Sequence, residues 1–210
     1  MPAMMVIRIG YSTLSADLAG LAGFLRRPSA LTAALGNELR NRLRGHFRQK
    51  NKREPNKLGG TRTNFWDRVG RSVTPKPEVS ADGLSVSVSI TDPNFAQKLF
   101  GGTIRANKGL YLTIPVSRRA HGKTVANLER DEHIKLVFVD RSYGGMLIEV
   151  PEKPGGKVKV DYILKPEVHQ EADPTALPDE QQLHEALRER AETYIDTARA
   201  SGWNYQDPTA

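Results

Sequence analysis

Side chains that could carry out acid–base or metal chemistry are present in this sequence, but they are scattered along it. No two of the five histidines have the HxxxH or HExxH spacing that places two metal ligands on one face of a helix. Asp131, Glu132 and His133 are consecutive, but their position between an expected loop and an expected strand favours a solvated turn. Carboxylates on the expected strands occur singly, at Asp140, Glu149 and Asp161. We therefore expect no metal site and no catalytic residue.

Motifs for nucleophilic catalysis and for phosphate binding do not occur in the sequence. The chain has no cysteine, which excludes disulfides, thiol nucleophiles, iron–sulfur clusters and cysteine-ligated zinc. There is no GxSxG, SxxK or GxxxxGK(S/T) motif, and the Gly-Gly pairs lack the strand–GxGxxG–helix context, so we interpret them as turns. The sequence thus predicts a protein that is not an enzyme and that uses no cofactor. A hydrolase with paired carboxylates is kept as an alternative.

Cationic side chains offer a different chemistry, which is contact with a polyanion. The formal net charge is +7 and is unevenly distributed, because residues 26–76 carry +11 and residues 167–210 carry −7. Arginines recur four residues apart on an expected helix and further cations follow, giving the candidate contact residues Arg40, Arg44, Arg48, Lys50, Lys52 and Arg53. Such a row neutralises phosphates without reading bases, and its binding weakens steeply with salt. An acidic protein neighbour or a solvated face would explain the row equally well.

Two long helices are predicted, one on each side of a central sheet. The first begins at Ser29, a suitable N-cap, and carries apolar residues at helical spacing as far as Phe47. A polar loop over 50–63 separates it from a short helix that begins after Asn64. The second long helix occupies 178–202, where proline and aspartate start it and glycine ends it. No apolar run approaches the ~20 residues of a membrane helix, so we expect no membrane contact.

Between these helices the apolar period changes to two, which predicts strands. The expected elements, in order, are a half-buried strand over 84–90, a short helix or strand over 95–100, a hairpin of 103–105 and 110–115 around a turn at 106–109, an exposed loop over 117–131, and a three-stranded meander of 134–140, 146–150 and 158–164. Gly-Gly pairs stand at both turns of the meander, where tight turns need positive φ.

These elements predict an α+β fold. A mostly antiparallel central sheet, partly barrel-like or sandwiched, is expected between an N-terminal helical region and a C-terminal helix. Three segments are distinguished: residues 1–28 with a short strand and a weak helix, residues 29–166 with the core helix and the sheet, and residues 167–210 with an acidic extended stretch and the last helix. No change of composition is sharp enough to mark two domains.

A series of short motifs resembles a known protein family. Residues 95–105 read FAQKLFGGTIR and residues 111–115 read YLTIP, and they are preceded by NKLGG at 56–60 and TNFW at 63–66. In this order the motifs are similar to those of the tail-completion, or virion morphogenesis, proteins of tailed bacteriophages and prophages. The resemblance covers about residues 29–165.

The resemblance implies a structural protein of the virion neck or tail, made in the host cytoplasm, that joins head and tail. It implies a homo-oligomeric ring, hexameric or dodecameric, around the DNA channel, with other neck or tail proteins as partners and non-specific DNA contact. The residues expected to meet an adjacent subunit or the tail tube are Phe100, Gly101, Gly102, Ile104, Asn107, Lys108 and Gly109. A stand-alone, non-specific nucleic-acid-binding module is the main alternative.

Overall fold

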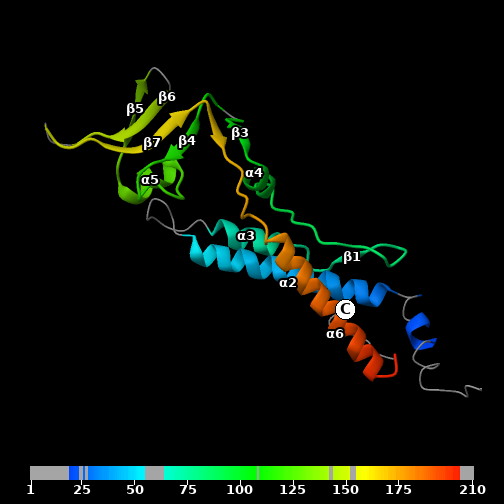
Figure 1. Ribbon diagram of the computed structural model, residues 1–210. Coiled ribbons are helices and arrows are strands. Elements are labelled where there is room, and N and C mark those ends of the chain that lie inside the picture. Colours follow the sequence, from blue (N-terminus) through cyan, green and yellow to red (C-terminus); the bar gives the residue numbers. More distant parts are fainter. Residues whose placement is uncertain are drawn as a thin grey trace, which may run out of the picture. The chain divides into compact units, whose positions relative to one another are not determined.

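The part of the chain that the computed structural model describes contains the helices α2 to α6, the strands β1 to β8 and a short helical stretch over residues 19–23 (Figure 1). This part comprises residues 19–23, 26, 28–54, 64–107, 109–141, 144–151 and 155–203. The helices are α2 (Ser29–Arg53), α3 (Phe65–Ser72), α4 (Phe95–Phe100), α5 (Val125–Glu132) and α6 (Glu180–Ala200). The strands are β1 (Glu78–Val79), β2 (Val86–Ser87), β3 (Gly102–Arg105), β4 (Leu112–Pro115), β5 (Leu136–Arg141), β6 (Gly144–Glu149), β7 (Lys159–Lys165) and β8 (Glu167–Gln170). The strand expected near the N-terminus lies outside the described residues.

The predicted α+β class and the C-terminal helix are confirmed. Strands form one sheet of order β4-β7-β6-β5 and two strand pairs, β1-β2 and β3-β8, and every pairing is antiparallel. Within the described ranges none of these sheets closes into a barrel. The meander is confirmed as β5, β6 and β7, which are neighbours in chain order. The Gly-Gly pair expected at its first turn lies within β6 instead, because Gly144 pairs with Arg141 and Gly145 pairs with Asp140.

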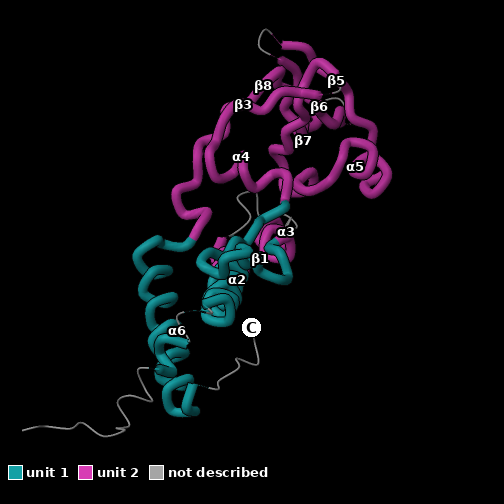
Figure 2. Tube along the Cα trace, turned by 90° about the vertical axis from the view of Figure 1, so that its right-hand side faces the viewer, with its two compact units in different colours: residues 1–45, 73–91, 178–210 teal, residues 46–72, 92–177 magenta. Residues whose placement is uncertain are grey.

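The chain divides into two compact units that alternate along the sequence (Figure 2). Unit 1 contains residues 1–45, 73–91 and 178–210, and unit 2 contains residues 46–72 and 92–177. Helix α2 therefore begins in unit 1 and ends in unit 2. Because each unit is assembled from segments that are distant in the sequence, the local composition does not show where one unit ends and the other begins.

Unit 1 combines the first half of α2 with β1, β2 and α6. A Cβ atom at Gly36 would lie 2.5 Å from Val86 Cγ2 and 2.7 Å from Pro77 Cβ, so α2 approaches the strand pair closely. Helix α6 begins as predicted, since the Asp179 side chain accepts a hydrogen bond from the Gln182 amide at 3.0 Å. Its buried residues are Ala186, Tyr194 and Ala198.

The strand expected over 84–90 was too long. Only Val86 and Ser87 form ladder pairs, and a single bridge joins Val73 to Ile90. The facing segment contains Pro75 and Pro77, which have no N–H group to donate to a ladder. The alternation of apolar residues with serine predicted that one side of this segment is exposed. It could not show that the facing segment contains prolines, which shorten the strand pair.

Unit 2 has an aromatic centre where three helices meet. Phe47 of α2 is fully buried, stacks on Trp66 of α3 with ring centroids 6.0 Å apart, and meets Phe95 of α4 edge-on at 5.6 Å. The short helix predicted after Asn64 is confirmed as α3. The segment at 95–100, for which helix and strand were both open, is the helix α4.

One face of the four-stranded sheet is covered by α5. Ala120, Leu128, Leu136 and Tyr162 are buried together there. The prediction of an exposed loop over 117–131 was therefore wrong for its second half. The Thr124 hydroxyl accepts a hydrogen bond from the Asn127 amide and caps α5, and Leu128 anchors the helix on the sheet.

The predicted hairpin of 103–105 with 110–115 does not form. Strand β3 pairs with β8 and β4 pairs with β7, and these two pairings belong to separate sheets. The two segments expected to pair with each other thus pair with two consecutive later strands, which only Pro166 separates.

Candidate assembly surfaces

The six cations predicted as a contact row on α2 do not form one surface. Arg40 donates to the Pro75 carbonyl, and Arg44 Nη2 donates to the Val73 carbonyl at 2.9 Å. Both side chains thus fasten α2 to the segment that leads into β1. Hydrogen bonds to backbone carbonyls are a structural role within unit 1.

Lys50 is buried inside unit 2. Its Nζ atom lies 2.7 Å from Glu54 Oε1 and 3.3 Å from Asp173 Oδ2, and it stands 4.7 Å from the centre of the Trp66 ring. With only 8% of its side chain exposed, Lys50 is not available to DNA or to another protein. Its charge is compensated within the fold, as a buried ammonium requires.

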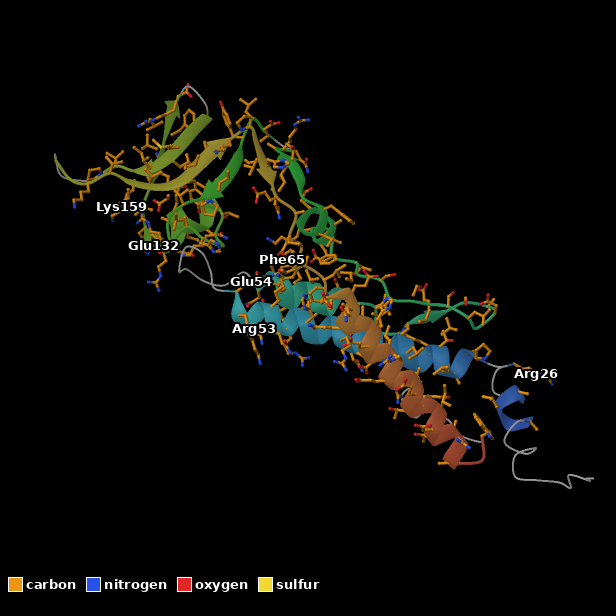
Figure 3. The ribbon with its side chains drawn as sticks, in the orientation of Figure 1. Arg26, Arg53, Glu54, Phe65, Glu132 and Lys159 are labelled. Atoms are coloured by element: carbon orange, nitrogen blue, oxygen red, sulfur yellow. The ribbon has the colours of Figure 1, made fainter. Side chains whose placement is uncertain are left out.

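Arg48, Lys52 and Arg53 remain exposed at the end of α2. Among the described residues none of these three side chains takes part in a hydrogen bond or an ion pair, and the helical repeat places them on the side away from Phe47 (Figure 3, where Arg53 is labelled). We call these three residues the α2 cationic end. It is the part of the predicted row that remains accessible.

Helix α6 presents carboxylates on its exposed side. Glu185, Glu189, Glu192 and Asp196 follow the i, i+4, i+7, i+11 spacing of one helical stripe, and all four are exposed. Arg188 contacts Glu192 at 3.7 Å, which leaves the stripe with net negative charge. We call these four residues the α6 acidic face. The spacing was visible in the sequence, where only the apolar stripe of this helix was considered.

The residues expected at a subunit contact lie around β3. Phe100 at the end of α4 is 77% exposed, and Leu110, which lies two residues before β4, is 81% exposed. Gly101 adopts a φ of 71°, and a Cβ atom there would lie 2.7 Å from the Gln170 carbonyl oxygen.

The other predicted members differ in exposure. Asn107 and Gly109 are exposed, whereas Gly102 and Ile104 are half-buried in the β3–β8 pair and Lys108 lies outside the described residues. Leu110 was not predicted as an exposed contact residue because it was assigned to a strand. The sequence signal against that strand was the preceding glycine, because glycine allows a positive φ such as the 114° of Gly109.

A cluster of charged residues at the edge of the α5-covered face was not predicted from the sequence. Strand β7 has one extra residue between the pairs Leu147–Tyr162 and Ile148–Val160, which is Asp161. This bulge directs the fully buried carboxylate toward Arg119, which donates to both Asp161 oxygens, at 2.9 and 2.6 Å, and also to Glu149. The Ser117 hydroxyl donates to the same carboxylate at 2.6 Å.

The ionisation of this cluster is fixed by its contacts. Burial alone would raise the pKa of Asp161, but hydrogen bonds from Arg119 and Ser117 outweigh it and keep that pKa below its usual range. The hydrogen bonds to Asp161 raise the pKa of Arg119 against the opposing effect of burial. Groups held in these charge states exchange no proton near neutral pH, so the cluster fastens residues 117–119 to the sheet.

The described part of the chain contains no cluster of three or more potential metal ligands. Among its helices, none combines the length and the hydropathy needed to cross a bilayer. We compared the chain with protein-family models, with curated proteins and with solved structures, and found no match in any of the three. The α2 cationic end and the α6 acidic face are therefore the structural observations from which a function can be inferred.

Proposed function

We propose that this protein is a structural virion subunit of a tailed phage or prophage. It would act at the neck or tail end as a tail-completion or head–tail joining protein, in a ring of identical copies around the DNA channel. The order of the motifs between residues 29 and 165 supports the family assignment. The structural observation that supports self-assembly is the presence, on one chain, of the α6 acidic face and the α2 cationic end.

These two surfaces suit a head-to-tail contact between copies. A contact between two different surfaces of the same chain repeats from copy to copy, and it closes into a ring when the rotation per subunit divides the circle. Carboxylates facing guanidinium and ammonium groups guide the approach and fix the register more than they add affinity. Such an assembly depends on salt, because exposed pairs are screened within ~10 Å at 0.1 M ionic strength.

The test is the oligomeric state of the purified chain. Sedimentation velocity and negative-stain electron microscopy should show rings at low salt that dissociate as salt is raised. Glu189→Lys with Glu192→Lys should abolish assembly, and so should Arg48→Glu with Lys52→Glu. Equimolar mixing of these two double variants should restore it, because each reversed surface then meets an opposite charge on the other protein.

The control reverses two acids elsewhere, at Glu78 and Glu171. Both are exposed, and neither belongs to the two surfaces. The Glu78→Lys, Glu171→Lys variant carries the same change in net charge as the α6 variant and should assemble like the wild type. Wild-type protein that stays monomeric at every salt and protein concentration would refute the ring.

A non-specific nucleic-acid-binding module is the second candidate. The exposure of Arg48, Lys52 and Arg53 supports it, because three cations on one helix end can contact consecutive phosphates. Aromatic side chains that would stack on bases are not beside them, since Phe47 and Trp66 are buried. Binding of this kind would be weak and independent of sequence.

A further inference from the structure

The face of the four-stranded sheet opposite α5 is aliphatic and partly exposed to solvent. Register and alternation place eight apolar residues of the strands on it: Leu112 and Ile114 of β4, Val137 and Val139 of β5, Met146 and Ile148 of β6, and Val160 and Ile163 of β7. None of the eight is buried, whereas Leu136, Tyr162 and Leu164 on the α5 side are. We call this surface the open face.

The open face is continuous across all four strands. One cross-strand row runs through Ile114, Ile163, Met146 and Val139, and a second runs through Val160, Ile148 and Val137. Val137 is 44% exposed, and Val150 and Val158, at the ends of β6 and β7, are 53% and 56% exposed. An aliphatic patch of this extent is typical of a surface that another protein covers.

Charges at the open face are all positive: Arg141 and Lys165 lie together at one end, and Lys135 lies alone just before the opposite end of β5. Arg141 of β5 and Lys165 of β7 flank Gly144 of β6 in a single row, because Arg141 pairs with Gly144 and the adjoining pair is Gly145–Leu164. Both cations are exposed, and within the described residues neither forms an ion pair. Along the described strands of this sheet no acidic residue occupies an open-face position. Gly144 must stay glycine, since a Cβ atom there would lie 2.1 Å from the Leu164 carbonyl oxygen.

A second copy placed face to face is a poor occupant. A twofold axis along the strands would set Arg141 and Lys165 against the same two residues of the other copy. A twofold axis across the strands would set them against Lys135, which follows the same alternation at the opposite end of β5. In either arrangement cations meet cations, and like charges brought together at an interface oppose association.

The spacing of the two cations indicates the shape of the occupant. Strands β5 and β7 are separated by β6, so Arg141 and Lys165 stand about 10 Å apart. That is the diameter of an α-helix with its side chains. A helix lying along β6 would rest on Met146 and Ile148, pass over Gly144, and have one cation on each side of its end.

We propose that the open face docks an amphipathic helix of a different protein, whose apolar stripe ends in carboxylates that bind between Arg141 and Lys165. The apolar rows supply affinity by burying aliphatic surface. The two cations set the polarity of the helix, because the acidic end meets a pair of cations over Gly144 and only Lys135 at the opposite end. The open face shares no residue with the α2 cationic end or with the α6 acidic face.

The test uses two synthetic helical peptides with the same leucine stripe, one with glutamates and one with lysines at the same end. Their affinity for the full-length protein is measured by fluorescence anisotropy. Wild-type protein should bind the glutamate peptide about tenfold more tightly than the lysine peptide, since two exposed charge pairs differ between them. Arg141→Glu with Lys165→Glu should reverse this preference. Ile163→Asp should weaken both peptides.

Lys76→Glu with Arg118→Glu is the matched control, because both residues are exposed and neither belongs to the open face. This variant should keep the wild-type preference, and circular dichroism checks that every variant is folded. Equal binding of both peptides by wild-type protein would overturn the proposal.

Two further outcomes would also overturn it. One is loss of self-association in Ile163→Asp, which would make the open face a contact between copies. The other is binding of wild-type protein, but not of Ile163→Asp, to phosphatidylglycerol vesicles. A chain that forms no rings yet prefers the glutamate peptide would refute the proposed ring and leave this docking site standing.

Discussion

At the scale of single residues, Lys50 shows how a cation predicted to contact a partner can be part of the core. The helical spacing places Lys50 on the buried face of α2, because it follows Leu39, Leu43 and Phe47 at the i, i+4, i+8, i+11 positions of the apolar stripe. A count of positive charges along the chain does not show on which face of the helix each cation lies. What the sequence could not show is that Asp173, far along the chain, supplies the compensating carboxylate.

This difference gives a paired prediction for Lys50 and Lys52. Lys50→Ala should lower the free energy of unfolding by about 2 kcal/mol, because it removes the nearer of the two cations that contact the largely buried Asp173 carboxylate and leaves only Lys98, at 3.7 Å. Lys52→Ala should change stability by no more than ~0.5 kcal/mol, as expected for an exposed side chain. Urea denaturation followed by tryptophan fluorescence measures both. Equal effects of the two substitutions would show that Lys50 is not held as described.

At the scale of elements, the local sequence predicted the helices and strands better than it predicted which strands pair. The meander was predictable because three apolar runs follow one another at short separations, and strands that are consecutive in the chain usually pair with each other. The pairing of β3 with β8 was not, since more than sixty residues separate the two strands and nothing near Ile104 identifies Val168. Helix α5 was missed because its single buried residue, Leu128, gives little periodicity in a charged segment.

The two glycines of α2 have opposite environments, which gives a prediction for this helix. A Cβ atom at Gly45 would have no neighbour within 4 Å, whereas one at Gly36 would clash with Val86 and Pro77. Gly45→Ala should therefore stabilise the protein by up to about 1 kcal/mol through helix propensity. Gly36→Ala should destabilise it by about 1–2 kcal/mol, because the contacting strand pair must move.

Thermal unfolding followed by circular dichroism distinguishes the two variants. The melting temperature should rise for Gly45→Ala and fall for Gly36→Ala. Since both replacements add the same methyl group to the same helix, propensity cancels in the comparison. A rise for both variants would mean that α2 does not pack on β1 and β2 at Gly36.

At the scale of the whole molecule, the sequence showed the division of charge but not the division of the fold. The basic and acidic stretches were evident from composition. The two compact units were not, because unit 1 collects the first half of α2, the β1–β2 pair and α6 from three separate parts of the chain. Folding also engages three of the six predicted contact cations internally, since Arg40 and Arg44 donate to backbone carbonyls and Lys50 pairs with carboxylates. The charge available to a partner is therefore smaller than the sequence implies.

The number of accessible cations sets the expected salt dependence of DNA binding by the whole chain. Each phosphate contact contributes about −0.9 to the slope of log K against log salt concentration, so three accessible cations give a slope of about −3, whereas all six would give about −5. Filter binding of duplex DNA over a series of salt concentrations measures the slope. Replacing Arg48, Lys52 and Arg53 together by alanine should remove most of the binding, and Arg40→Ala should leave the slope unchanged. A slope near −5 that survives the triple substitution would locate the DNA contact elsewhere and would favour a dedicated nucleic-acid-binding protein over a ring subunit that lets DNA slide.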